Sequence, residues 1–239
     1  MPKTPSTELV TPAVASPPPS STRLRLGPPR RWIVIPTRQG SKGVPNKGLR
    51  PLAGTSIVER ALEVATAIGG ETIVTTDYPQ SLLPVSYPYQ YHARPALLAK
   101  DTAPMSEVLA LLAQYYRWSQ DDIIVLLQPT SLHPQRASLI LTALDGPIPA
   151  VSVDRFPDRW HPYYSINPQR PFLPPPCRQG LPVRYRPNGL FYLMTGAMAG
   201  GGSLWLHKPV YVETPGTINI DEEADWQEAE AVYGDLSHL

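Results

Sequence analysis

Cysteine is almost absent from this 239-residue sequence, in which Cys177 is the only one. A single thiol excludes an intrachain disulfide and a metal site built from several thiolates. Long apolar runs are also lacking, since no stretch approaches the roughly 18 residues of a membrane helix. Prolines interrupt the N-terminal segment, so it has no apolar core of a secretory signal. We therefore expect a cytoplasmic protein with no membrane partner.

An excess of one charge is the third absence, because 21 Lys and Arg residues face 20 Asp and Glu residues. A net charge of +1 gives no global field for nucleic acid, and any anion site must come from a local cluster. Proline, in contrast, is abundant at 31 residues, well above a typical share of about 5%. Residues 1–30 are rich in Pro, Ser and Thr and show no periodicity, which predicts a disordered tail before one domain at 31–239.

Short apolar runs alternate with amphipathic segments from Trp32 onward. Ser56 and Glu59 have the spacing of a helix-capping box, and the helix that they begin is expected to end at Gly69. This alternation predicts an α/β fold with a mainly parallel sheet sandwiched by helices. The predicted strands cover 32–36, 72–77, 123–127, 150–153, 190–193 and 209–212, and further helices begin at Ser106 and at Glu222, the last one capped by Asp221.

In such sheets, ligands bind beyond the carboxyl ends of the strands. Residues 37–48 follow the first strand there and read TRQGSKGVPNKG, with three cations, Arg38, Lys42 and Lys47, among glycines. Close backbone N–H groups and several cations suit a triphosphate. The order is not that of a Walker P-loop. A solvated basic turn is the alternative interpretation.

Two further polar clusters follow predicted strands. Gln128, Thr130 and Ser131 offer neutral donors and acceptors for sugar hydroxyls, although alone they are typical of a turn. Asn219 and Asp221 point the same way in an extended segment and suit a Mg²⁺ ion that keeps several waters. A helix N-cap at Asp221 is the competing interpretation.

Five segments together resemble the acylneuraminate cytidylyltransferases, also called CMP-sialic acid synthetases. The resemblance runs from Trp32 to about Tyr233 and implies a nucleotide-diphospho-sugar transferase-like fold. It also implies transfer of CMP from CTP to an acidic sugar with Mg²⁺ or Mn²⁺, and a homodimer in which 155–182, an irregular stretch rich in Pro, Tyr and Arg, is the dimerisation excursion. The segments are IPTRQGSKGVPNKGL at 35–49, RPALLAKDTAPM at 94–105, QPTS at 128–131, RQGLPVRYRPNGLFYL at 178–193 and NIDEEADW at 219–226.

The resemblance implies a role for each matching position. Nucleotide, sugar acid and metal each receive their own group of residues. The triphosphate would be held by Arg38 and Lys47 with Lys42 nearby, and the cytosine framed by Arg94, the backbone around Ala103, and Met105. The sugar acid would face Gln128, Thr130, Ser131, Asn188, Tyr192 and Arg178, and Arg178 would pair with its carboxylate. The metal would be bound by Asp221 with Asn219.

Four features of the sequence depart from the family's usual pattern. Gly48 stands where an Asn is usual, Asn219 replaces an Asp, Leu-His-Pro follows at 132–134, and 78–95 is rich in proline where a helix is expected. The sugar is therefore left open among N-acylneuraminate, 3-deoxy-octulosonate, pseudaminate and legionaminate. A catalytically silent nucleotide-binding homologue is the alternative from another class.

Overall fold

A computed structural model of the chain describes residues 28–40, 43–155, 184–202 and 208–236. Lys42, Cys177 and Arg178 lie outside these residues. So do nearly all of the predicted N-terminal tail and of the predicted excursion at 155–182. No helix in the described ranges is both long and apolar enough to cross a membrane.

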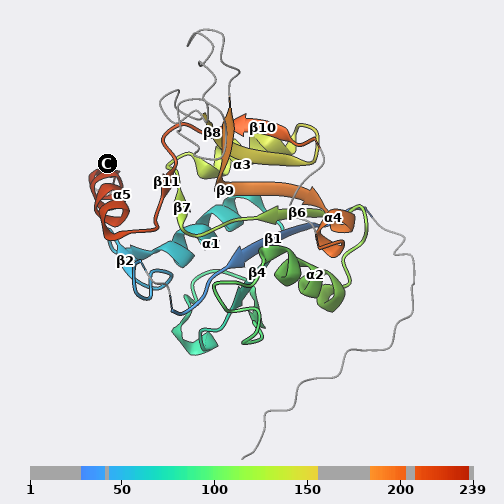
Figure 1. Cartoon of the computed structure of the whole chain (residues 1–239), viewed down its shortest axis with the longest axis horizontal. Helices are drawn as coiled ribbons and strands as arrows, with labels where there is room; N and C mark the ends of the chain where they lie inside the picture. Colours follow the sequence, from blue (N-terminus) through green and yellow to red (C-terminus); the bar gives the residue numbers. More distant parts are fainter. Residues whose placement is uncertain (1–27, 41–42, 156–183, 203–207, 237–239) are drawn as a thin grey trace, which may run out of the picture.

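A seven-stranded sheet forms the centre of the molecule (Figure 1). Its neighbours run in the order β10-β8-β9-β6-β1-β4-β5. All pairs are parallel except those of β9, which is antiparallel to β6 and β8. The predicted mainly parallel sheet is therefore confirmed. Its strands are β1 (Arg31–Pro36), β4 (Glu71–Thr76), β5 (Gln90–Ala93), β6 (Ile123–Leu126), β8 (Ala150–Arg155), β9 (Tyr185–Thr195) and β10 (Val210–Glu213).

The two faces of the sheet are covered by different helices. In β1, Ile33 and Ile35 belong to a core that includes residues of α1 (Ile57–Ile68) and α3 (Arg136–Leu144). Trp32 and Val34 point to the opposite face and pack with α2 (Met105–Tyr116) and α4 (Gly196–Gly200). Because successive strand residues alternate in direction, one apolar run can supply both cores. This is the physical basis of the sandwich that the sequence predicted.

Local signals set the ends of the first helix as expected. The side chain of Ser56 accepts a hydrogen bond from the backbone N–H of Glu59 at 3.2 Å. Gly69 ends the helix with φ +70°, a conformation that favours glycine. The proline-rich stretch at 78–95 forms only a short 3-10 helix, η1 (Gln80–Leu82), and β5.

A third core lies beside the sheet and joins the basic loop to the C-terminus. Two small ladders, β2 (Pro51–Leu52) with β3 (Thr55–Ser56) and β7 (Ser131–Leu132) with β11 (Ile218–Asn219), meet the helix α5 (Glu223–Leu236) there. Val44, Ile220 and Trp226 are fully buried in this core. The helix begins at Glu223, and Asp225 accepts hydrogen bonds from the backbone N–H groups of residues 221 and 222. The prediction that Asp221 caps this helix was wrong, because residue 222 occupies the position before the helix and the carboxylate of Asp221 lies against Lys47.

Candidate functional site

Two adjoining cavities open at the carboxyl ends of β1, β4 and β6. The inner cavity has a volume of about 240 Å³, and the outer cavity has about 630 Å³. They share Arg38 and Arg94, so these two cations stand at the boundary. The inner cavity is lined by Pro36, Thr37, Arg38, Lys47, Gly48, Ile57, Arg94, Met105, Gln128, Pro129 and Thr130.

The basic loop is fastened to the sheet at its beginning. The backbone N–H of Thr37 donates to the carbonyl of Thr75 at 3.1 Å. The N–H of Gln39 donates to Oδ1 of Asp77 at 2.8 Å. Arg38 forms an ion pair with Asp101 across the outer cavity, and both side chains are about one-third exposed. This ion pair therefore joins the basic loop to the segment that contains Asp101.

Lys47 joins the loop to the segment before α5. Its Nζ donates to the carbonyl of Ile220 at 2.7 Å and lies 3.6 Å from Oδ1 of Asp221. The Lys47 side chain is mostly buried, whereas that of Asp221 is 80% exposed. At Gly43 an added Cβ would collide with the carbonyl oxygen of Asp221, so only glycine permits this close approach. The structure therefore brings two of the predicted site residues, Lys47 and Asp221, together.

Arg94 is buried with unused hydrogen-bonding capacity. Only 6% of the residue is exposed, and its Nη2 donates to the carbonyl of Thr75 at 2.7 Å. Its Nε has no hydrogen-bond partner among the described residues. Burial lowers the pKa of the guanidinium to about 10, the Asp77 carboxylate opposes that shift, and Arg38 adds to it. A buried cation with an unpaired donor is costly unless an acceptor arrives, so Arg94 is suited to a ligand.

The turn after β6 is held from behind by a buried arginine. Arg136 is 3% exposed, and its guanidinium donates to the carbonyls of Leu190 and Gln128 at 2.5–3.1 Å. Burial lowers the pKa of Arg136 to about 9. An added Cβ at Gly189, which has φ +76°, would collide with Oε1 of Gln128. Gln128 and Thr130 are thereby held at the wall of the inner cavity.

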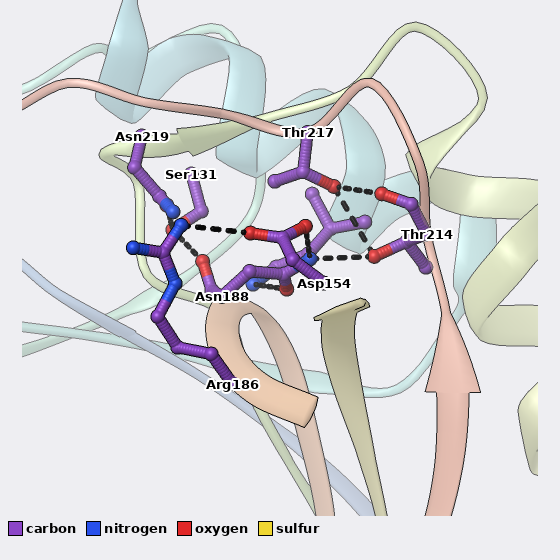
Figure 2. A network of polar contacts seen from close by, with 8 residues as sticks. Ser131, Asp154, Arg186, Asn188, Thr214, Thr217 and Asn219 are labelled. Atoms are coloured by element: carbon purple, nitrogen blue, oxygen red, sulfur yellow. Dashed lines mark hydrogen bonds and ion pairs between the residues drawn. The ribbon is translucent and has the colours of Figure 1, made fainter. Parts of the chain in front are cut away.

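Ser131 and Asn188, two predicted sugar residues, lie instead in a polar network behind that wall (Figure 2). Ser131 Oγ bonds to the carbonyl of Asn188 at 3.0 Å and to Oδ1 of Asn219 at 2.7 Å. The Asn188 amide donates to Asp154 at 2.9 Å and to Thr214 at 2.7 Å, and its oxygen accepts the N–H of residue 190. Both are at least 97% buried. They do not line either cavity.

The remaining predicted residues fall in different places. Met105 begins α2 and lines the inner cavity. Ala103 lies in the preceding turn, where its N–H donates to the carbonyl of Lys100 at 3.1 Å. Tyr192 packs against the core beneath α2, and burial raises the pKa of its hydroxyl. Lys42 and Arg178 are outside the described residues.

Sequence reasoning missed several residues of this site. Asp77 and Asp101 were not singled out, although each contacts a member of the basic loop. Asp77 is the last residue of a predicted strand, a position that marks ligand sites in such sheets. The Asn-Gly pair at 188–189 was a turn signal that could have indicated the close packing at Gly189. Arg136 carried no such signal, because its role depends on burial.

A metal could be held only by a small donor set. Within the described part of the chain there is no group of three or more His, Cys, Asp or Glu side chains able to hold an ion. Asp221 offers an exposed carboxylate whose ion pair is with Lys47, and the Asn219 amide oxygen accepts from Ser131. One carboxylate and one amide oxygen fit Mg²⁺, which commonly retains waters and takes further oxygens from substrate phosphates.

Comparisons with known proteins identify sequences that are similar to this chain. Residues 32–135 match the model of the cytidylyltransferase family. N-acylneuraminate cytidylyltransferase B of Danio rerio is 28% identical over 216 residues, which are 84% of this chain and 50% of the relative. The chain thus spans about half the length of this curated relative.

Solved structures share the fold. A CMP:2-keto-3-deoxy-manno-octonic acid synthetase complexed with CTP superimposes with a TM-score of 0.61 at 18% identity, covering 86% of this chain and 99% of that one. A 4-diphosphocytidyl-2C-methyl-D-erythritol synthase gives 0.57 at 10% identity, covering 86% and 99%. This chain is therefore similar over residues 32–135 to the cytidylyltransferase family and over most of its length to an N-acylneuraminate cytidylyltransferase, and it shares the fold of these solved structures.

Proposed function

We propose that this protein transfers the CMP group of CTP to an acidic sugar of the N-acylneuraminate or a related ulosonic acid class. The anomeric hydroxyl of the sugar attacks the α-phosphorus, the bond to the bridging oxygen breaks, and pyrophosphate leaves. The hydroxyl proton passes to solvent. Such a displacement requires alignment and charge neutralisation more than covalent chemistry by the protein.

One observation carries the proposal: three arginine and lysine side chains converge on the inner cavity. Arg38, Lys47 and Arg94 line it together, at the edge of the sheet where ligands of α/β proteins bind. A polyphosphate is the small-molecule group that three adjacent cations suit best. Lys42 would add a fourth cation from the same loop.

Cytosine recognition is assigned to Arg94, the backbone around Ala103, and Met105. Cytosine presents a ring nitrogen and a carbonyl oxygen side by side, which match the fork of an arginine. The unpaired Nε of Arg94 supports this role. Met105 offers an adaptable apolar surface for the flat ring.

The sugar acid is assigned to the Gln128 side of the inner cavity. Gln128 and Thr130 face the cavity and are the candidates for direct contacts. Ser131 and Asn188 lie behind them and would act by fixing their position. Arg178 remains the proposed partner of the sugar carboxylate, with Tyr192 nearby in the motif. The assay described below distinguishes among the ulosonic acids.

Asp221, with Asn219, is the proposed protein ligand of Mg²⁺ or Mn²⁺. A bound divalent ion would neutralise charge on the phosphates. Lys47 lies against the same carboxylate and against the cavity, so it can shift its contact from Asp221 to a phosphate. The carboxylate of Asp221 would then be free to hold the ion.

We also propose a cytoplasmic homodimer, as the resemblance implies, with residues 155–182 at the contact. Light scattering during size-exclusion chromatography measures the mass directly. A monomer at micromolar concentration would contradict the proposed dimer but would leave the proposed reaction unaffected.

The activity is tested by pyrophosphate release with Mg²⁺, CTP and a panel of sugar acids. The panel holds N-acetylneuraminate, 3-deoxy-octulosonate, pseudaminate and legionaminate, and glucose 1-phosphate serves as a control without a carboxylate. We expect release with one of the four acids and none with the control. Binding of CTP without turnover of any acid would instead favour a catalytically silent nucleotide-binding protein.

A further inference from the structure

Thr37 and Gly48 share one space at the wall of the inner cavity. A Cβ added at Gly48 would collide with Oγ1 of Thr37, and its other neighbours would be side-chain carbons of Val58 and Tyr78 at 3.5 and 3.6 Å. Both Thr37 and Gly48 line the cavity. The hydroxyl of Thr37 therefore occupies the position from which a side chain at residue 48 would begin.

Thr37 is a buried residue whose hydroxyl lies at the wall of the cavity. The residue is 7% exposed, and it lines the inner cavity. Its backbone N–H donates to the carbonyl of Thr75. Its Oγ1 is not among the fully buried unpaired atoms of the described residues, which fits a hydroxyl that is open to the cavity. A hydroxyl that faces a cavity can donate to a ligand that enters it.

The surroundings define the ligand chemistry. Thr37 precedes Arg38 and Gly48 follows Lys47, and both cations line the same cavity. A group that attracts two cations is an anion, and a hydroxyl beside them can donate to an anionic oxygen. In the proposed reaction this oxygen belongs to the CTP phosphates.

We propose that Thr37 is a nucleotide-binding residue whose hydroxyl donates to a phosphate oxygen, and that Gly48 keeps it in place by leaving that space free. This inference rests on the proposed binding of CTP. It also accounts for the departure at position 48, where an Asn is usual in the resembling family. The polar contact has moved from residue 48 to the facing Thr37.

The test measures CTP and pyrophosphate binding by isothermal titration calorimetry. Thr37→Val keeps the shape and removes the hydroxyl, and we expect both ligands to bind about tenfold more weakly. Thr37→Ser keeps a hydroxyl and should lose clearly less. Gly48→Ala should force the hydroxyl of Thr37 to rotate away and reproduce the loss.

The double variant Thr37→Val/Gly48→Ala should be no weaker than either single variant, because both changes remove one contact. In Thr37→Ala/Gly48→Asn, the removed hydroxyl leaves room for an amide that can donate in its place. That variant should recover affinity relative to Thr37→Ala alone.

Thr72→Val is the matched control, because Thr72 is also 7% exposed but lies at the other end of β4 and lines neither cavity. It should bind both ligands as the wild type does. Wild-type affinity in Thr37→Val, an equal loss in Thr72→Val, or a loss for CTP with none for pyrophosphate would each overturn the inference while leaving CTP binding intact. A wild-type protein that binds no CTP would instead refute the proposed function.

Discussion

The inner cavity and the network behind it are both rich in polar groups, yet they differ in what those groups contact. In the network, Ser131, Asn188, Asp154 and Asn219 are joined by hydrogen bonds of 2.7–3.0 Å (Figure 2). At the cavity, Arg94 retains a buried donor without a partner among the described residues, and Thr37 lines the open space. Polar groups that pair within the protein hold its shape, whereas unpaired ones indicate where a ligand completes the structure.

This difference separates two roles that the motifs alone had merged. The resemblance assigned Gln128, Ser131 and Asn188 alike to the sugar acid, but only Gln128 reaches the cavity. Ser131 and Asn188 are positioned to fix the wall that Gln128 belongs to. The experiments below test whether substitutions at the cavity and substitutions in the network have different effects on function and stability.

The largest effect is expected at Asp221, on the cavity side. Asp221→Ala should lower turnover roughly 100-fold or more, because the variant loses the proposed charged metal ligand. Its free energy of unfolding should change by no more than about 0.5 kcal/mol, since the side chain is exposed and does not cap α5. Steady-state kinetics and urea unfolding measure the two quantities. Glu222→Ala, its exposed neighbour, is the control, and substantial activity in Asp221→Ala would remove the metal assignment.

The network should respond in the opposite way. Asn188→Ala removes one hydrogen bond each from the carboxylate of Asp154, the hydroxyl of Thr214 and the N–H of Leu190. We expect a loss of about 2 kcal/mol in the free energy of unfolding, because buried groups are left unsatisfied. CTP affinity should fall much less than in variants of Arg94. Unchanged stability with a large loss of CTP affinity would place Asn188 in the binding site.

A smaller effect is expected at Asn219, the network residue that the resemblance assigns to the metal. Asn219→Asp can still accept the hydrogen bond of Ser131 and adds a negative charge two residues before Asp221. The Mg²⁺ concentration for half-maximal turnover should therefore fall, by about threefold. A Mg²⁺ titration of both proteins at saturating CTP measures it. An unchanged half-saturation point would show that residue 219 only shapes the turn.

The smallest effect is expected at the ion pair of Arg50 with Glu223 on α5, which we call the clamp. Arg50 forms two hydrogen bonds of 2.7 Å with Glu223 and lies over the ring of Trp226 at 4.3 Å, close to the segment that bears Asp221. Glu223→Gln should raise the half-saturating Mg²⁺ concentration by less than about twofold, because exposed ion pairs contribute little.

The pH dependence of this clamp has a definite sign. Arg50 lowers the pKa of the Glu223 carboxyl below its ordinary value. The pair therefore stabilises the fold above the ordinary glutamate pKa and is lost as the pH falls through the lowered value. Wild type and Glu223→Gln should differ in melting temperature at pH 7 and converge in acid. Exposed Glu228→Gln on the same helix is the control and should show no such convergence.

Much of this architecture could be predicted because local chemistry decides it. The run at Trp32–Pro36 serves two cores at once, and Ser56 with Gly69 sets the ends of α1. The antiparallel direction of β9 could not be predicted from its apolar residues, because strand direction depends on the path of the chain between elements. The helix α3 was missed for a different reason. Arg136 is charged yet buried, so the inward face of this helix does not show an apolar pattern in the sequence.

The site was predictable in its residues more than in their arrangement. Arg38, Lys47, Arg94, Met105, Gln128 and Thr130 were all expected and line one cavity. Nothing in the sequence indicated that Ser131 and Asn188 turn away from it, because hydrogen-bond partners 26–88 residues apart decide that. The space shared by Thr37 and Gly48 likewise appears only in three dimensions.

The most direct test of the central claim, a cytidine nucleotide site at Arg94, is a calorimetric titration with CTP and UTP. Wild type should bind CTP at least about tenfold more tightly than UTP, because the two bases differ at the ring nitrogen that faces the arginine fork. Arg94→Met should weaken CTP binding by about 100-fold and remove most of the preference, since two charge-assisted bonds are lost. Equal affinity of the wild type for both nucleotides, or full CTP affinity in Arg94→Met, would contradict the claim.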